Sequence, residues 1–172
     1  MHYAKADQQV LGYLGRALSL ELSAVQLYST QARLLGAWGL AEASGRMSHE
    51  AREELGHADR IIGRMLAMGV APNASQLRPV KLGSSLLELL LFDHEFENEL
   101  VSLYTQATNH CARVGDQDSR VFFETLLNEE KAHAYELVHW INQIKTGQIE
   151  QPEVDVKSAT TNNSPKLMGR TR

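Results

Sequence analysis

One pattern recurs in the two halves of the sequence with a constant separation of 76 residues, for example from residue 54 to residue 130. The repeated positions are Glu21, Tyr28, Glu54 and His57 in the first half, and Glu97, Tyr104, Glu130 and His133 in the second. Each half thus contains a Glu-x-x-His motif, whose two side chains point to the same side of a helix. A lone pair of this kind is common on solvated helix faces, but its recurrence in register predicts two matched halves of one site.

The spacing of apolar residues predicts four long helices, at about residues 7–37, 40–68, 85–114 and 116–145. Asp7, Ser85 and either Asp116 or Asp118 are suitable N-caps, and Ser85 with Glu88 has the spacing of a capping box. Residues 69–83 contain two prolines and no helical period. A connection of this length allows a crossover along a bundle, with the second and third helices parallel.

The repeated polar residues fall on the apolar stripes of these helices. The expected stripe of the first helix is Leu11, Leu14, Leu18, Val25, Ala32 and Leu35, with Glu21 and Tyr28 filling its gaps. That of the third helix is Leu90, His94, Glu97, Val101, Tyr104, Thr108 and Cys111. A buried carboxylate costs several kcal/mol unless it is paired or bound to a metal. The alternatives are a solvated Glu21 at the edge of its stripe, or buried Glu–His networks without metal.

Four carboxylates and two imidazoles on a four-helix bundle match an arrangement that holds two metal ions, in which two helices each supply a Glu and two a Glu-x-x-His. These oxygen and nitrogen donors suit iron or manganese better than zinc or copper. The single cysteine, Cys111, is outside the set, which excludes an iron–sulfur cluster or a structural zinc as its natural occupant. The sequence therefore predicts a dinuclear metal site.

Composition limits the remaining possibilities. The chain has 172 residues, 43% of them hydrophobic, which suits one compact domain. The net charge of −4 and the lack of a basic cluster make nucleic acid an unexpected partner. No apolar run approaches the roughly 20 residues that span a bilayer, and no secretory signal is recognisable, so we expect a cytoplasmic protein without membrane contact. We expect residues 1–147 to form the bundle and residues 148–172, rich in polar residues and proline, to be a flexible tail.

Over about residues 4–145 the sequence resembles the bacterioferritins. The matching residues include Trp38-Gly39-Leu40, His49-Glu50, Glu54-x-x-His57-Ala58-Asp59 and Glu129-Glu130-x-x-His133, together with Glu21 and Glu97. The resemblance implies a ferritin-like bundle that assembles into a hollow 24-subunit shell, oxidises Fe(II) with dioxygen or peroxide, and stores ferric mineral. It implies two iron ions per subunit, one held by Glu21 and His57, the other by Glu97 and His133, and both bridged by Glu54 and Glu130.

Two positions depart from the family pattern. Bacterioferritins bind haem between paired subunits through a methionine directly after the bridging glutamate of the second helix, and here that residue is Leu55. We therefore expect no haem in the homomer, with Met47 and Met65 packed in the core. The family's short fifth helix is also not recognisable after residue 146. One alternative is a catalytic subunit in a mixed shell with a haem-binding sister subunit. Another is a di-iron oxidase or peroxidase that does not store iron.

Several further residues are candidates for supporting roles. The resemblance implies that Tyr28 lies near the metals and could supply an electron, although a core tyrosine bonded to a ligand carboxylate fits as well. Tyr104 is expected to orient a carboxylate. His94 is expected to be a supporting or core residue, although a ligand role stays open, and His49 with Glu53 is either a route toward the mineral or a solvated face. His110 and His139 have no predicted partner.

Overall fold

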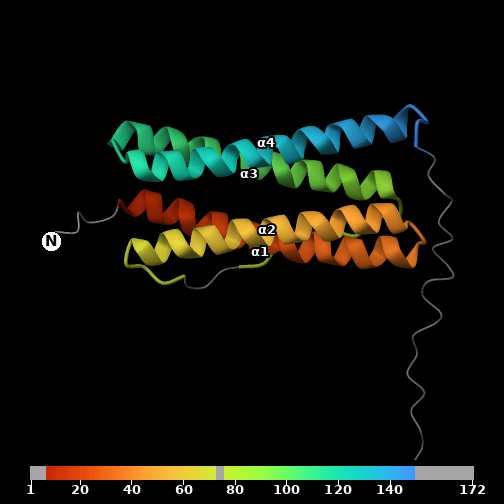
Figure 1. The fold of residues 1–172 in the computed structure, drawn as a ribbon, viewed down its shortest axis with the longest axis horizontal. Coiled ribbons are helices and arrows are strands. Elements are labelled where there is room, and N and C mark those ends of the chain that lie inside the picture. The colour runs from red at the N-terminus through yellow and green to blue at the C-terminus, as the bar shows by residue number, and fades with distance from the viewer. Residues whose placement is uncertain (1–6, 73–75, 150–172) are drawn as a thin grey trace, which may run out of the picture.

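The computed structural model describes residues 7–72 and 76–149, and in them the chain forms four helices. These are α1 (Gln8–Ala37), α2 (Ala41–Ala67), α3 (Leu86–Val114) and α4 (Gln117–Lys145). Figure 1 shows α1 and α2 as one antiparallel pair and α3 and α4 as a second pair stacked on it. The predicted all-α, four-helix architecture is confirmed.

Polar caps fix where three of the helices begin. The Asp7 carboxylate accepts hydrogen bonds from two backbone N–H groups of the first turn of α1, and Asp116 does so once for α4. The Ser85 hydroxyl accepts from the backbone N–H of Glu88, as the predicted capping box requires. The Glu88 carboxylate reaches back to the backbone N–H of Ser84 and not to that of Ser85. The reciprocal half of the box is therefore displaced by one residue.

The connections decide how the helices are ordered in space. Gly39 and Gly115 have φ values of 80° and 76°, a left-handed conformation that favours glycine, and each lies in a short turn between antiparallel helices. The long connection instead returns along the bundle, so that α2 and α3 run in the same direction (Figure 1). Its described part is held to α1, because the hydroxyls of Ser19 and Ser23 accept hydrogen bonds from the backbone N–H groups of Gln76 and Arg78. The expected crossover is confirmed.

The hydrophobic core consists of two clusters on either side of a polar layer. The first contains Leu14, Leu18, Ile61, Leu100, Phe123 and their neighbours. The second contains Leu35, Met47, Leu90, Trp140, Ile144 and their neighbours. The repeated glutamates and histidines lie between the clusters in sequence on every helix, so apolar packing encloses the polar layer on both sides.

The predicted stripes need correction at several positions. Leu11 and Val25 are only half-buried. On α3 the expected His94 and Val101 are half-buried, whereas the residue before each of them, Asp93 and Leu100, is buried. A stripe with strict heptad spacing drifts by about 20° per heptad on a straight α-helix, and a core-facing stripe is wider than a single seam. Neighbouring residues therefore replace the expected ones away from the centre of each helix.

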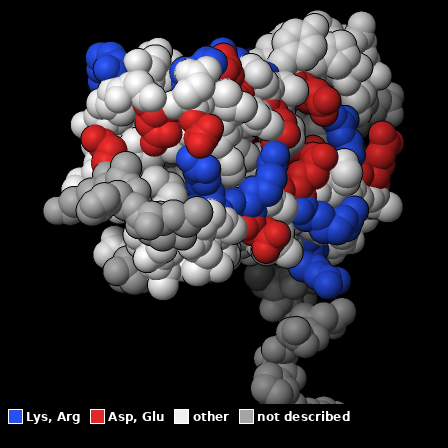
Figure 2. Space-filling view, turned by 60° about the vertical axis from the view of Figure 1, so that its left-hand side comes forward, with Lys and Arg blue, Asp and Glu red and all other residues white. Residues whose placement is uncertain are grey.

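The surface of the described part of the chain carries charges of both signs. Figure 2 shows the molecule with the end at which α1 begins turned forward, and on this face Lys and Arg side chains lie beside Asp and Glu side chains. None of the described helices combines the length and the apolar character that a bilayer crossing would need. Cys111 is buried, as expected for a cysteine that packs as an apolar residue.

The expected boundary between bundle and tail falls close to the end of the described residues. Ile149 packs against the second core cluster, and its backbone N–H donates to the carbonyl of Gln143. The contacts of the bundle therefore include Ile149, two residues after the expected boundary at residue 147. The rest of the expected tail, residues 150–172, lies outside the described part of the chain.

Candidate metal centre

All six predicted ligands lie near the middle of the helices and point into the polar layer. They are Glu21 on α1, Glu54 and His57 on α2, Glu97 on α3, and Glu130 and His133 on α4. The three-residue spacing places Glu54 and His57, and likewise Glu130 and His133, on the same side of one helix turn. The structure therefore brings together, from four helices, the residues that the repeat singled out.

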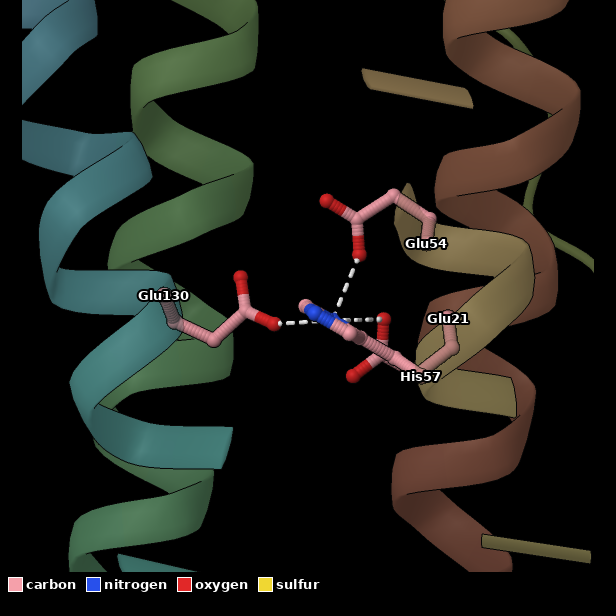
Figure 3. A group of neighbouring side chains, drawn as sticks. All are labelled: Glu21, Glu54, His57 and Glu130. Carbon is pink, nitrogen blue, oxygen red and sulfur yellow. Dashed lines mark ion pairs between the residues drawn. The ribbon is translucent and has the colours of Figure 1, made fainter. Parts of the chain in front are cut away.

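The first group that can hold a metal ion is formed by Glu21, Glu54, His57 and Glu130. Figure 3 shows the three carboxylates converging on the imidazole from α1, α2 and α4. The His57 Nδ1 atom lies 2.7 Å from a Glu130 oxygen, 3.1 Å from a Glu54 oxygen and 3.5 Å from a Glu21 oxygen. Within the group, one donor atom from each residue lies within 4.8 Å of all the others, which is compact enough for one ion.

The second group is formed by Glu54, Glu97, Glu130 and His133, so that it shares two glutamates with the first. The His133 Nδ1 atom lies 3.3 Å from the second oxygen of Glu54 and 3.6 Å from the second oxygen of Glu130. The two imidazole rings are nearly parallel, with centroids 5.7 Å apart. Each shared carboxylate thus turns one oxygen toward each histidine, which is the arrangement a bridging ligand needs.

The donor atoms of this layer are buried and lack aligned hydrogen bonds within the protein. They are Glu21 Oε2, both oxygens of Glu54, His57 Nδ1, Glu97 Oε2, both oxygens of Glu130 and His133 Nδ1. The distances among them allow ion pairing, but the geometry of a hydrogen bond is not met. Buried polar atoms without partners are costly, and cations placed among these atoms would satisfy them. The residues present therefore fit a pair of metal ions.

Two tyrosines hold the carboxylates that are not shared. The Tyr28 hydroxyl donates to Glu97 Oε1, and the Tyr104 hydroxyl donates to Glu21 Oε1. Both phenols are buried, and burial raises their pKa well above the usual value, so they remain protonated donors. Each tyrosine occupies one oxygen of its carboxylate and leaves the other oxygen free to face the cluster.

The protonation of the metal-free layer follows from burial and from its internal contacts. Burial raises the pKa of Glu21 and of Glu97 well above the usual value. Burial opposes ionisation of Glu54 as well, but contacts with the two histidines outweigh it and lower the pKa of that carboxyl.

The remaining three groups follow the same balance. The histidines lower the pKa of Glu130 despite its burial. Burial disfavours the charged imidazoles, but the surrounding carboxylates raise the pKa of His57 to about 12 and that of His133 to about 11. Without metal, both histidines are thus imidazolium groups at neutral pH, and cations must displace their protons.

Two further carboxylates lie behind the imidazoles. The His57 Nε2 atom is 3.2 Å from a Glu129 oxygen, and the His133 Nε2 atom is 3.3 Å from a Glu53 oxygen. Arg60 binds both oxygens of Glu129. Neither Glu129 nor Arg60 was among the predicted site residues, although Glu53 and Glu129 are also separated by 76 residues and the repeat could have indicated Glu129.

The other candidates are placed as follows. His94 contacts the Asn98 amide and lies outside both four-residue groups, although it is one helix turn from Glu97. His49 lies 3.5 Å from Glu53 on an exposed part of α2. His110, for which the sequence indicated no partner, is buried and lies 3.0 Å from the Asp7 carboxylate. This pairing joins α3 to the start of α1, a contact that sequence spacing cannot indicate.

Leu55 points away from the metal layer. Its side chain is exposed and lines an open groove of about 340 Å³ between α1 and α2. The other residues of the groove are Val25, Ser29, Ala32, Arg33, Ser44, Ser48, Ala51 and Arg52. None of these lining residues offers a sulfur or an imidazole that could serve as an axial ligand to a haem iron. Met47 and Met65 are buried in the core, as expected.

Comparison with known proteins agrees with this geometry. Residues 11–147 match the family model for the ferritin-like domain. The chain is 39% identical to a bacterioferritin of Rhodobacter capsulatus over 129 residues, which is 75% of this chain and 80% of that protein. It is 32% identical to a bacterial ferritin of Synechocystis over 132 residues, covering 76% and 85% of the two chains.

A solved structure is similar over nearly the whole chain. It is a 2.6 Å structure of Rhodobacter capsulatus bacterioferritin with a metal-free dinuclear site and haem iron in a crystallographic special position. The TM-score is 0.80 at 34% sequence identity, and the match covers 96% of this chain and 99% of the other. From the matched bundle, the two overlapping ligand groups and the sequence identity, we conclude that the chain belongs to the bacterioferritin family of ferritin-like proteins.

Proposed function

We propose that this protein oxidises Fe(II) to Fe(III) at a dinuclear site within each subunit and stores the ferric product as mineral in a hollow shell. The observation that carries this proposal is the pair of ligand groups that share Glu54 and Glu130 in the middle of a four-helix bundle. Membership of the bacterioferritin family supports iron as the metal.

The proposed ligand assignment follows the two groups. Glu21 and His57 would hold one ion, Glu97 and His133 would hold the other, and the shared Glu54 and Glu130 would contribute to both. Four ionised carboxylates match the charge of two divalent ions, while the neutral imidazoles contribute Nδ1. The two irons supply one electron each to the oxidant, dioxygen or peroxide, when they are bound.

The protein's own groups prepare this site in three ways. The two core clusters exclude water from the layer, which strengthens its electrostatic interactions. Tyr28 and Tyr104 hold the terminal carboxylates in position by their hydroxyl groups. Tyr28 is also the proposed source of an additional electron during oxidation, because its buried ring lies one hydrogen bond from Glu97.

Storage requires assembly, and here the proposal rests on the family. We expect 24 subunits to form a shell, with residues 1–147 as the assembling domain and residues 148–172 as a tail. The proposed partners are Fe(II), the oxidant and other subunits. None of the described helices is long and apolar enough to span a bilayer.

The groove at Leu55 favours one specific variant of this function. The Rhodobacter capsulatus protein contains haem iron, whereas the groove at Leu55 in this chain is lined by no sulfur and no imidazole. We therefore propose that a homomeric shell of this chain lacks haem. The second candidate function is that of a catalytic subunit in a mixed shell, in which a sister subunit with methionine at the position of Leu55 supplies the haem.

The test is to purify the chain alone, add Fe(II) under air, and record ferric absorbance together with particle size. A fast rise in ferric absorbance and a particle of shell size support the proposal. Fast oxidation by a particle of one or two subunits would instead favour an oxidase or peroxidase that does not store iron. Slow oxidation at the uncatalysed rate would refute the ferroxidase assignment.

A further inference from the structure

The two histidines of the metal layer each have a carboxylate on the side away from the metals, and these carboxylates come from the opposite helix pair. Glu129 on α4 faces the Nε2 atom of His57 on α2, at 3.2 Å. Glu53 on α2 faces the Nε2 atom of His133 on α4, at 3.3 Å. The side chains of Glu129 and Glu53 are 39% and 40% exposed, so the two contacts are closely matched in geometry and in solvent access.

Glu129 and Glu53 differ in the side chains that hold their carboxylates in place. Arg60 donates two hydrogen bonds to Glu129, one to each oxygen, and so fixes the plane of the carboxylate. Glu53 pairs on its own helix with an exposed His49, at 3.5 Å, and its other close neighbour on that helix is the carboxylate of Glu50, which cannot hold it by hydrogen bonds as a guanidinium does. The residue 76 positions after Arg60 is Glu136, which cannot donate in this way. The carboxylate that faces His57 is therefore fixed by two hydrogen bonds from Arg60, whereas the carboxylate that faces His133 is not held by an arginine.

This difference has a direct consequence for metal binding. Both histidines turn Nδ1 toward the shared glutamates, so a metal ion bound there leaves the proton on Nε2. A carboxylate that accepts from Nε2–H fixes the ring orientation and increases the basicity of the ligating nitrogen. A fixed acceptor does this without the loss of side-chain entropy that a mobile acceptor requires.

We propose that Arg60 and Glu129 form a positioning pair for His57, and that this pair makes the Glu21–His57 position bind divalent cations more tightly than the Glu97–His133 position. The inference rests on the proposed dinuclear site and deepens it, because it makes the two metal positions unequal. Arg60 and Glu129 touch neither metal nor oxidant and act only through the imidazole.

The experiment isolates each position with Co(II), whose visible absorption reports ligand geometry. The Glu97→Ala protein retains the complete Glu21–His57 position, and the Glu21→Ala protein retains the complete Glu97–His133 position. Each assembled protein is titrated anaerobically with Co(II), alone and with the matched substitution, which is Glu129→Gln in the first and Glu53→Gln in the second. Both substitutions remove one negative charge at nearly the same distance from a histidine. The difference between their effects on Co(II) affinity therefore measures the contribution of the Arg60–Glu129 contact and not that of the charge.

We expect Glu129→Gln to raise the Co(II) dissociation constant of its position by roughly 10- to 100-fold and to shift the absorption band. Glu53→Gln should have a clearly smaller effect on both. Arg60→Ala, which leaves Glu129 in place, should weaken the same position as Glu129→Gln. Arg60→Lys should recover only part of the affinity, because an ammonium group cannot hold both oxygens as a guanidinium does.

Two results would overturn the inference. One is an equal effect of Glu129→Gln and Glu53→Gln, which would reduce both residues to their charge. The other is an unchanged affinity and band in Arg60→Ala. Failure of the proposed function is distinguishable, because an unmodified protein that binds fewer than two Co(II) ions per chain would lack the dinuclear site altogether.

Discussion

Replacement of Asp93 by asparagine tests how the bundle accommodates a buried acid outside the metal layer. Asp93 lies on α3 and is fully buried, and the Gln31 side-chain amide donates a hydrogen bond of 2.6 Å to its Oδ1 atom. Its Oδ2 atom is buried without a partner. Burial raises the pKa of Asp93 to about 8, against a lowering by Gln31, and Glu50 adds to the rise. Asp93 is therefore a neutral acid in the folded protein at neutral pH.

The magnitude follows from the difference between the folded and the unfolded pKa. Because the folded pKa, about 8, is above the ordinary value of 3.8, the folded state holds a proton that the unfolded state has lost throughout this interval. The stability that depends on this proton is complete below pH 3.8 and is lost as the pH rises through 8. The loss is about 1.4 kcal/mol per pH unit within the interval, hence about 2.7 kcal/mol between pH 5 and pH 7.

An asparagine side chain has nearly the same shape as a protonated aspartic acid and does not titrate. We therefore expect the free energy of unfolding of Asp93→Asn, relative to that of the parent protein, to be about 2.7 kcal/mol higher at pH 7 than at pH 5. This change does not depend on the difference between the two proteins at pH 5. The assay is urea unfolding of both metal-free proteins at these two pH values, followed by far-UV circular dichroism at equal protein concentration. Titration of the metal-layer groups is common to both proteins and cancels.

A stability difference between Asp93→Asn and the parent that is the same at pH 5 and pH 7 would refute the reasoning. It would mean that Asp93 is ionised in the folded protein across this range.

Four further predictions concern the metal layer, the tail and the haem surface. Glu97→Ala and His133→Ala should each abolish the fast phase of Fe(II) oxidation, while the circular dichroism spectrum should keep its helical form. Oxidation at the parent rate in both variants would contradict the ligand assignment. Co(II) binding to the metal-free protein should weaken as the pH falls and release about one proton per ion or more, because the raised pKa values of the two imidazoles make protons compete with metal and the raised pKa values of Glu21 and Glu97 act in the same direction. Calorimetry in buffers of different ionisation enthalpy measures the number of protons released, and a value near zero would contradict this prediction. Ending the chain after Ile149 should shift the melting temperature by less than about 2 °C, since the removed segment is poor in large apolar residues, and a larger loss would indicate docking. The purified homomer should show no haem Soret band after haem supplementation, whereas Leu55→Met should introduce one; a band in the unmodified protein would point to another axial ligand.

The sequence by itself determined the parts of the fold that depend on local periodicity and on registration. Helix bounds follow from caps such as Asp7 and Ser85 and from glycines such as Gly115, all of which act within a few residues. The six proposed ligands were identifiable because a repeat of 76 residues places equal residue types at equal heights of two helix pairs. The crossover was identifiable from the length and the prolines of residues 69–83.

Only the tertiary structure decided which side chains meet across helices. Which tyrosine reaches which carboxylate depends on how the two helix pairs are stacked, and the structure crosses them, Tyr28 to Glu97 and Tyr104 to Glu21. The pairings of Asp93 with Gln31 and of His110 with Asp7 likewise join distant segments.

The difference between the two metal positions is also a tertiary property. The sequence repeat makes Glu53 and Glu129 equivalent, and it predicts equal surroundings for the two histidines. Arg60 breaks this equivalence, because its guanidinium on α2 reaches a carboxylate on α4. A contact between segments 69 residues apart depends on the packing of one helix pair against the other, so the spacing of residues along the chain cannot indicate it.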